Sequence, residues 1–216
     1  MIVTIDGPAG TGKSTVAKTL ASRLGFEFLN TGAMYRAVAY ACLQRELDLA
    51  DVAAVGQVAP TLEIAFTKSR LILDGHDVTE AIHGQEVTLG ASVVAANPLV
   101  RGCLVALQQA AARGTSLVTE GRDQGTVVFP EAECKFFLTA SPVERAKRRQ
   151  RELQAKGEIL PLEDLLSQQA LRDERDQTRA CSPLQPAEDA ILIDTTAMSL
   201  EEVTGYLESL VHRRLA

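Results

Sequence analysis

The chain has 216 residues, of which 46% are hydrophobic and 23% are charged, which suits one globular domain with its own core. The formal net charge of −6 at pH 7 repels polynucleotides, so an RNA- or DNA-binding protein is not expected. Four scattered cysteines and three histidines form no cluster, which argues against a zinc site and for reduced thiols. With no signal peptide or membrane span predicted, we expect a cytoplasmic monomer that binds small molecules.

Short apolar runs alternate with longer amphipathic stretches along the chain. This alternation predicts an α/β fold in which a five-stranded parallel sheet carries helices on both faces. Ligands are expected beyond the carboxyl ends of the strands. The predicted strands are Ile2–Ile5, Phe26–Leu29, Leu117–Thr119, Phe136–Thr139 and Ile191–Ile193.

Residues 7–14 match the phosphate-loop pattern G-x-x-x-x-G-K-[S/T] between the first strand and an amphipathic helix. Glycines let backbone N–H groups turn toward phosphate oxygens without side-chain clashes. Lys13 is expected to reach the β- and γ-phosphates, and the Ser14 hydroxyl to ligate Mg²⁺. The alternative, a glycine turn that binds nothing, does not explain the position of the match. The base-reading and switch motifs of a GTPase are absent from the chain, which favours a kinase.

The segment after the second strand, residues 30–36, lies on the expected ligand edge. Thr31 is predicted to cap the next helix and to leave Tyr35 and Arg36 on its first turn, facing the cleft. The planar guanidinium of Arg36 suits a phosphate, but a surface arginine on a capped helix explains the residues equally well.

From about Thr61 to Thr79 the alternation of strand-like and helix-like patterns is interrupted. Its apolar residues alternate with polar ones over residues 62–66, 70–75 and 76–78, which predicts antiparallel strands with a turn near Asp74-Gly75. We interpret it as a small β insertion on one rim of the domain.

Residues 120–130 follow the third predicted strand and crowd Gly121, Arg122 and Asp123 onto the ligand edge. A purely structural Arg122–Asp123 ion pair is one interpretation. Because buried ion pairs are costly, a site role is favoured.

Two helices are expected around a mobile lid. Ser141-Pro142-Val143-Glu144 predicts a helix start, and Pro161 opens a second helix that runs to about Thr178. The stretch from Lys156 to Pro161 is interpreted as the lid tip. One or two basic residues of the first helix are expected to act on phosphates, while Glu144 and Glu152 balance the rest. These residues are Arg145, Lys147, Arg148, Arg149 and Arg151.

Arg172, Asp176 and Arg179 are spaced i, i+4, i+7, which places them on one helix face. They could hold a sugar hydroxyl and a phosphate together, but spacing alone favours an ordinary solvated charge stripe. A last helix is predicted from about Ser199 to Arg214.

Four ordered motifs resemble the bacterial cytidylate kinases, a family of P-loop nucleoside monophosphate kinases, over nearly the whole chain. They are residues 6–14, Thr31–Arg36, Gly121–Pro130, and Arg172–Arg179 closing on Pro183-Leu184. The β insertion after Thr61 also resembles that family's enlarged monophosphate-binding region. The resemblance implies an adenylate-kinase-like P-loop fold with a core of residues 1–60, 98–144 and 180–216, a monophosphate-binding insertion at about 61–97 and a helical lid at about 145–179.

The resemblance also implies roles for single residues. Lys13, Arg122, Asp123 and Arg172 would be catalytic. Arg36, Arg122 and Arg172 would hold the acceptor phosphate beside Thr31 and Tyr35, while Ser92, Arg101 and Asp123 would read cytosine with help from Arg179. Asp176 would accept from the ribose hydroxyl. Independently of the resemblance, the basic residues expected to act from the lid are Arg145, Arg148 and Arg149. The expected ATP-binding residues are Gly7, Pro8, Ala9, Gly10, Thr11, Gly12, Lys13, Ser14 and Thr15.

The activity implied is an in-line, Mg²⁺-dependent transfer of phosphoryl from ATP to CMP or dCMP. A P-loop kinase for UMP, AMP or shikimate is the nearest alternative, and a nucleotide-binding switch ATPase is a more distant one. The chain departs from the family pattern at Asn30, where aspartate is usual. Because the amide carbonyl still accepts a hydrogen bond, tuning of the metal surroundings is expected rather than loss.

Overall fold

The computed structural model describes residues 1–67, 70–155 and 157–215. These residues form two compact units, one of Met1–Leu29 with Ala112–Ala216 and the other of Asn30–Ala111. The first residue of the expected lid tip, Lys156, lies outside the described residues.

The main sheet confirms the predicted fold class. Its five strands run in the order β2-β6-β1-β7-β8, and β1 pairs in parallel with both β6 and β7. The central strand β1 is fully buried at Val3, Thr4 and Ile5, as expected for a strand covered on both faces. The strands are β1 (Ile2–Asp6), β2 (Glu27–Asn30), β6 (Leu117–Gly121), β7 (Cys134–Thr139) and β8 (Ile191–Asp194).

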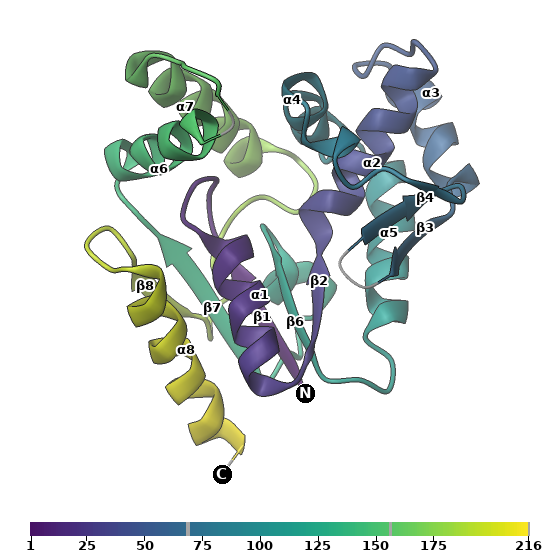
Figure 1. The fold of residues 1–216 in the computed structure, drawn as a ribbon. Coiled ribbons are helices and arrows are strands. Elements are labelled where there is room, and N and C mark those ends of the chain that lie inside the picture. Colours follow the sequence, from purple (N-terminus) through teal and green to yellow (C-terminus); the bar gives the residue numbers. More distant parts are fainter. Residues whose placement is uncertain (68–69, 156, 216) are drawn as a thin grey trace. The chain divides into compact units, whose positions relative to one another are not determined.

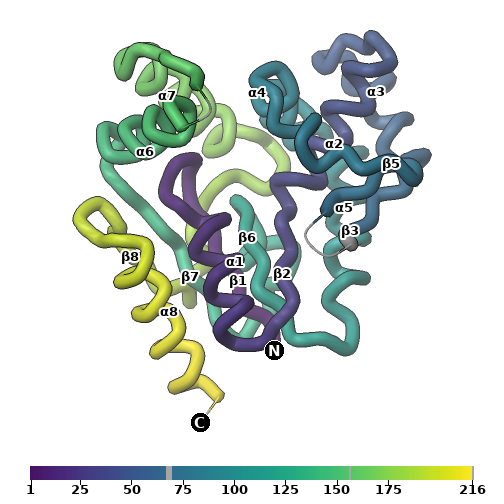
Figure 2. The backbone as a smooth tube through the Cα atoms, in the orientation of Figure 1, coloured from purple at the N-terminus to yellow at the C-terminus, as the bar shows by residue number. Residues whose placement is uncertain are grey.

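Helices α1 (Lys13–Leu24) and α8 (Leu200–Leu215) lie side by side against the sheet (Figure 1). Both helices send apolar residues into a single core with the strands, including Val16 and Leu20 from α1 and Leu207 from α8. This core fixes β1 relative to α1, and therefore holds both ends of the loop that joins them. Figure 2 shows the chain leaving β1 through that loop directly into α1.

Helices α6 (Pro142–Gln154) and α7 (Leu162–Thr178) form an antiparallel hairpin with a small apolar core of Ala146, Leu153 and Leu165. The predicted helix start is confirmed, because the Ser141 hydroxyl accepts a hydrogen bond from the Glu144 amide at 3.3 Å. Helix α7 begins directly after Pro161, also as predicted.

The second unit begins with α2 (Thr31–Gln44), which packs on α4 (Gln85–Val94). The predicted antiparallel insertion is confirmed as a sheet of order β3-β4-β5, although its first strand begins at Ile64 rather than Leu62. Positive φ angles of 49° at Asp74 and 80° at Gly75 are typical of the two-residue hairpin turn that the sequence predicts. The remaining elements are α3 (Val52–Val58), η1 (Ala59–Thr61), β3 (Ile64–Thr67), β4 (Arg70–Leu73), β5 (His76–Asp77), η2 (Ala81–His83) and α5 (Pro98–Ala111).

Over the described parts of the chain, no helix taken singly is long and apolar enough to cross a bilayer. The bent pair α4 and α5 reaches the required length and hydropathy only in combination, with an angle of 97° between its helices.

Candidate active site

The loop between β1 and α1 has backbone angles that require glycine. Gly7 has a φ of 144°, and a Cβ there would lie 2.1 Å from the Leu138 carbonyl oxygen. Gly10 has a φ of 79°, and its Cβ would lie 3.0 Å from the Cβ of Arg145. Gly12 caps α1 in a left-handed conformation without a side-chain hydrogen bond. The first turn of α1 is therefore left to present its N–H groups to an anion.

Lys13 is buried at the start of α1, and its amine donates to the Pro8 carbonyl across the loop at 2.7 Å. Burial is the largest cause that lowers the pKa of this amine from 10.5 to about 7, and the charges of Arg122 and Arg172 act in the same direction. The carboxylates of Glu120 and Asp6 oppose the shift. Two guanidinium groups, opposed by two carboxylates, thus act on the loop lysine, and the arginines favour the binding of phosphate there.

Asp6, the last residue of β1, is 4% exposed and accepts two backbone hydrogen bonds. Its Oδ1 accepts from the Gln124 amide at 2.9 Å and its Oδ2 from the Gly125 amide at 2.8 Å. Burial outweighs the two amides, which favour the ionised form, and raises the pKa of Asp6 to about 7. The carboxylate joins the central strand to the π-helical segment η3 (Gln124–Val128) that follows Asp123.

Arg122 pairs with Asp176 of α7 rather than with its neighbour Asp123. The Arg122 Nε donates to Asp176 Oδ2 at 2.8 Å, and its Nη1 donates to the Gly121 carbonyl at 3.2 Å. Asp123 Oδ1 instead lies 3.8 Å from Arg179 Nη2, with both side chains at most 5% exposed. The interpretation of an Arg122–Asp123 ion pair is therefore wrong.

The solvated charge stripe that spacing favoured on α7 is also wrong. Asp176 is 4% exposed, and α7 ends at Thr178, so Arg179 lies beyond the helix in extended backbone. Although burial opposes ionisation of Asp176, the charges of Arg122 and Arg172 keep its pKa below the ordinary value. A shared cluster on the first unit thus contains Lys13, Arg122, Asp123, Arg172, Asp176 and Arg179.

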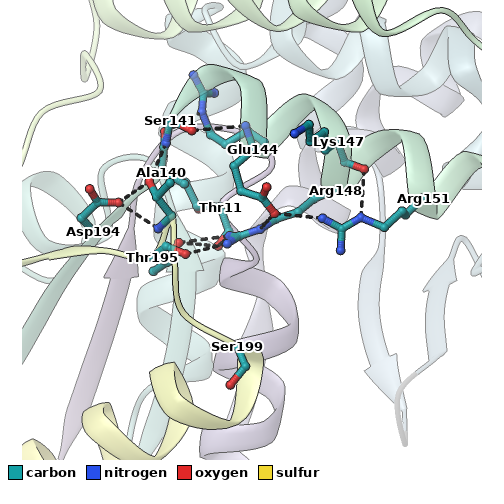
Figure 3. A network of polar contacts seen from close by, with 12 residues as sticks. Thr11, Ala140, Ser141, Glu144, Lys147, Arg148, Arg151, Asp194, Thr195 and Ser199 are labelled. Atoms are coloured by element: carbon teal, nitrogen blue, oxygen red, sulfur yellow. Dashed lines mark hydrogen bonds and ion pairs between the residues drawn. The ribbon is translucent and has the colours of Figure 1, made fainter.

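Two lid arginines hold the phosphate loop through backbone carbonyls. The Arg145 Nη1 donates to the Ala9 carbonyl at 3.0 Å and lies 2.7 Å from Asp173 Oδ2. The Arg148 Nη1 donates to the Thr11 carbonyl at 3.1 Å, and its Nη2 donates to the Thr195 carbonyl at 2.6 Å. Figure 3 shows the guanidinium of Arg148 in contact with Thr11, Thr195 and Glu144.

The other arginines of α6 lie nearer the surface. Arg149 pairs with Glu152 at 3.2 Å, and Arg151, with 66% of its side chain exposed, pairs with Glu144 at 2.9 Å. These contacts match the expected balance by the two glutamates. The structure thus distinguishes Arg145 and Arg148, which contact the loop, from Arg149.

The second unit carries the remaining predicted residues. The cap of α2 is Asn30, not Thr31, because the Asn30 Oδ1 accepts from the Ala33 amide at 3.0 Å. Tyr35 and Arg36 follow in the second turn rather than the first. The Arg101 guanidinium lies 5.6 Å from the centre of the Tyr35 ring, a cation–π contact between α5 and α2. Ser92 on α4 is buried, and its hydroxyl donates to the Leu89 carbonyl.

A sequence model of cytidylate kinase matches residues 3–213. The chain belongs to the cytidylate kinase family. A cytidylate kinase from Stutzerimonas stutzeri is 49% identical over 94% of this chain and 91% of its own length. Another from Rhodopirellula baltica is 47% identical over 94% of this chain and 89% of its own length. The identity spans both units, so the family assignment covers every motif described above.

Among solved structures, an uncharacterized protein from Eubacterium ventriosum has a TM-score of 0.53 and 13% identity. It covers 99% of this chain and 98% of its own. This similarity concerns the fold alone.

Oxygen ligands suited to Mg²⁺ lie beside the phosphate loop of this kinase. Ser14 supplies an exposed hydroxyl, and Glu120, at the end of the strand next to β1, supplies a buried carboxylate. In the described part of the chain, no group of three or more His, Cys, Asp or Glu side chains could hold a metal ion. The hydroxyl of Ser14 and the carboxylate of Glu120 fit Mg²⁺, because this ion keeps several waters and binds substrate phosphates with only one or two protein oxygens.

Sequence reasoning gave no role to Glu120, Asp6 or Thr195. Glu120 had a usable signal, because an acid that ends an apolar strand beside the first strand is a common metal-side group in P-loop proteins. Asp6 lay inside a motif that was explained by its glycines. Thr195 meets Arg148 mainly through its backbone carbonyl, which carries no side-chain signal.

Proposed function

We propose that this chain transfers the γ-phosphoryl group of ATP to CMP or dCMP, giving ADP and CDP or dCDP. The observation that carries the proposal is the cationic cluster around Lys13. The amine of Lys13 lies at the phosphate loop, and the charges of Arg122 and Arg172 act on it. The donor and acceptor phosphates would therefore both lie next to these three positively charged side chains. Membership of the cytidylate kinase family supports the choice of acceptor.

In the proposed reaction, an oxygen of the acceptor phosphate attacks the γ-phosphorus in line. The new oxygen–phosphorus bond forms as the bond to the β,γ-bridging oxygen breaks, and ADP leaves with that oxygen. The acceptor phosphate is already ionised, so no general base is needed. Lys13, Arg122 and Arg172 stabilise charge on the transferring oxygens. Mg²⁺ held by Ser14, with Glu120 nearby, would neutralise charge on the donor phosphates.

The acceptor roles belong to the same proposal. Arg36, Arg122 and Arg172 hold the acceptor phosphate beside Thr31 and Tyr35. Ser92, Arg101 and Asp123 read the cytosine with Arg179, and Asp176 accepts from the ribose hydroxyl. The cation–π contact between Arg101 and Tyr35 supports a common site for these two residues. Residues of about 61–97 form the monophosphate-binding insertion.

The lid, residues of about 145–179, excludes water while the triphosphate is bound. Contacts of Arg145 and Arg148 with the loop carbonyls support this role for them. Arg149 is proposed to act only at the surface of the lid, where it pairs with Glu152. The kinase is proposed to act as a monomer in the cytoplasm. Its four free cysteines support this compartment, because thiols stay reduced there.

A coupled assay of ADP release tests the function. CMP, dCMP, UMP, AMP and shikimate are compared as acceptors at equal concentration, with a reaction lacking acceptor as control. We expect turnover with CMP or dCMP to exceed that with every other acceptor. A preference for UMP, AMP or shikimate would overturn the acceptor assignment, and ATP consumption independent of acceptor would indicate a switch ATPase instead.

A second arm tests the donor site. Lys13→Ala removes the loop amine and should lower kcat by several orders of magnitude while the fold persists. Near-normal transfer by this variant would contradict the assigned role of Lys13.

A further inference from the structure

Asp6 is a buried acid that the proposed reaction leaves without a role. It ends the central strand, immediately before Gly7 opens the phosphate loop. A carboxylate at 4% exposure is unfavourable unless hydrogen bonds compensate for the lost water. Both of its oxygens are so compensated, and by consecutive amides of one segment, those of Gln124 and Gly125.

The segment that Asp6 holds directly follows two residues that are proposed to bind the acceptor. Arg122 and Asp123 are the two residues directly before Gln124, and Asp123 caps η3. With Gln124 and Gly125 fixed to the end of β1, the backbone of Asp123 has little freedom to move. The Arg122–Asp176 and Asp123–Arg179 contacts depend on that placement.

Gly125 shows how closely this segment approaches β1. A Cβ at Gly125 would lie 3.0 Å from Thr4 Oγ1 and 3.5 Å from Asp6 Oδ2. Thr4 and Asp6 are two residues apart on a strand, so their side chains point to the same face. The strand therefore presents a surface that fits a glycine and holds the two amides, and any larger residue would displace the turn.

We propose that Asp6 is a positioning residue for phosphoryl transfer, which fixes Arg122 and Asp123 relative to the phosphate loop by holding the amides of Gln124 and Gly125. The inference rests on the proposed function for its kinetic consequence but not for its structural one. Asp6 contacts neither nucleotide in this scheme. Asp6 directly precedes the phosphate loop and holds the segment that follows Arg122 and Asp123. One side chain therefore fixes the groups that bind the donor phosphates relative to those that bind the acceptor phosphate.

Asp6→Asn is the direct test, because it keeps the shape of the side chain but replaces one acceptor oxygen by an N–H donor. That donor would face a backbone N–H, and the turn would be displaced. We expect kcat with CMP to fall by about 10²-fold, as misplacement of reacting groups by about 1 Å can produce. The Kd of ATP, measured by titration without acceptor, should change less than threefold.

Gly125→Ala tests the same contact from its other side and decides the question if Asp6→Asn does not fold. It should reproduce the loss of kcat, and the double variant should lose little more than either single one, because both changes displace one turn. Thr204→Val is the matched control. Thr204 is fully buried and its hydroxyl donates to the Leu200 carbonyl within α8 at 2.8 Å, so the variant removes a buried hydrogen bond that does not involve residues 122–125. Its kcat should stay within about twofold of the parent.

Backbone amide hydrogen exchange separates this inference from the proposed function. In the parent chain the amides of Gln124 and Gly125 should be protected, and in Asp6→Asn their exchange should be at least tenfold faster. Normal kcat in a folded Asp6→Asn or Gly125→Ala variant would overturn the inference, and so would a loss of ATP binding equal to the loss of turnover. If the parent failed to phosphorylate CMP, faster exchange in Asp6→Asn would still support the structural role.

Discussion

The guanidinium of Arg122 and the carboxylate of Asp176, 54 positions apart in the chain, form an ion pair of 2.8 Å. Only 16% of the Arg122 side chain and 6% of the Asp176 side chain are exposed. The pair ties the loop after β6 to α7, and so connects two of the motifs on which the family resemblance depends. Both residues are proposed to contact the same acceptor nucleotide, so the pair holds them in place before it binds.

Asp176→Asn should destabilise the chain, because it keeps the side-chain shape but leaves Arg122 as a buried cation without its counter-ion. We expect a loss of about 3 kcal/mol in the free energy of unfolding, measured by urea denaturation. Since the pKa of Asp176 is lowered on folding, the pair stabilises the fold above the unfolded value of 3.8 and is lost as the pH falls below it.

Glu152→Gln is the control for this prediction. It breaks the exposed pair with Arg149 on α6, which should change stability by less than about 0.5 kcal/mol. Equal losses for the two variants would show that burial adds nothing to the Arg122–Asp176 pair.

ATP binding should be coupled to protonation of Lys13. Burial, with Arg122 and Arg172, lowers the pKa of this amine from 10.5 to about 7, so it is largely neutral at pH 8 in the free chain. A triphosphate beside the amine favours its charged form and raises the pKa. Binding at pH 8 should therefore take up a proton, and the Kd of ATP should rise by up to about tenfold from pH 8 to pH 9.

Calorimetric titrations in buffers of different ionisation enthalpy measure that uptake directly. Lys13→Arg is the control, because a guanidinium stays protonated over this range and should take up no proton. Identical heats in all buffers for the parent chain would contradict the prediction. In the absence of ligand the unfolded chain holds this proton between pH 7 and pH 10.5, so Lys13 should make stability rise with pH in that window.

Arg148 and Arg149 are neighbours on α6 and should nevertheless differ in their effect on ATP binding. Arg148 holds the carbonyls of Thr11 and Thr195, whereas Arg149 contacts Glu152 at the surface. Arg148→Ala should weaken ATP binding by about tenfold or more, as expected when charged hydrogen bonds worth about 1.5–3 kcal/mol are lost. Arg149→Ala should change the Kd less than twofold. Titration of ATP in the absence of acceptor measures both, and equal effects would contradict the division of roles on α6.

The strands and the phosphate loop were predictable because their signals are local. Each strand of the main sheet is a short apolar run, and the loop residues must satisfy backbone angles that glycine alone adopts readily. The hairpin turn at Asp74-Gly75 was predictable for the same reason. In each case the residues whose type predicts the structure are the same residues that form it.

The roles of the charged residues were less predictable because their partners are distant in the chain. Spacing on α7 could not reveal that Asp176 meets Arg122, and it assigned Arg179 to a helix that ends one residue earlier. On α6, Arg145 and Arg149 are one turn apart and lie in the same basic stretch of sequence. The difference lies in the Ala9 carbonyl, a backbone group that the sequence does not distinguish.

Asn30 should act as a helix cap whose replacement by alanine destabilises α2. Its Oδ1 accepts from the Ala33 amide, and loss of such a cap costs about 1 kcal/mol. Asn30→Asp restores the residue usual in the family, keeps the acceptor and adds a negative charge at the helix start, so it should add about 0.3–1 kcal/mol. Urea denaturation measures both variants. Thr31→Ala should have the smaller effect, and a larger loss there than in Asn30→Ala would return the cap to Thr31.

Gly10 and Gly75 allow the contact between the phosphate loop and the lid to be measured apart from backbone strain. Their φ angles are 79° and 80°, so alanine should cost about 1 kcal/mol of backbone strain at either position. A Cβ at Gly75 meets nothing within 4 Å, whereas one at Gly10 would lie 3.0 Å from both Arg145 Cβ and Gln169 Nε2.

Gly75→Ala should therefore lower the free energy of unfolding without changing the Kd of ATP. Gly10→Ala should add a displacement of α6 or of the loop itself, and should weaken ATP binding by at least about tenfold, because the loop carbonyls held by Arg145 and Arg148 would move. Urea denaturation and ATP titration together separate the two effects. If Gly10→Ala bound ATP as tightly as Gly75→Ala does, the close packing of α6 and α7 on the loop would have no part in holding the triphosphate.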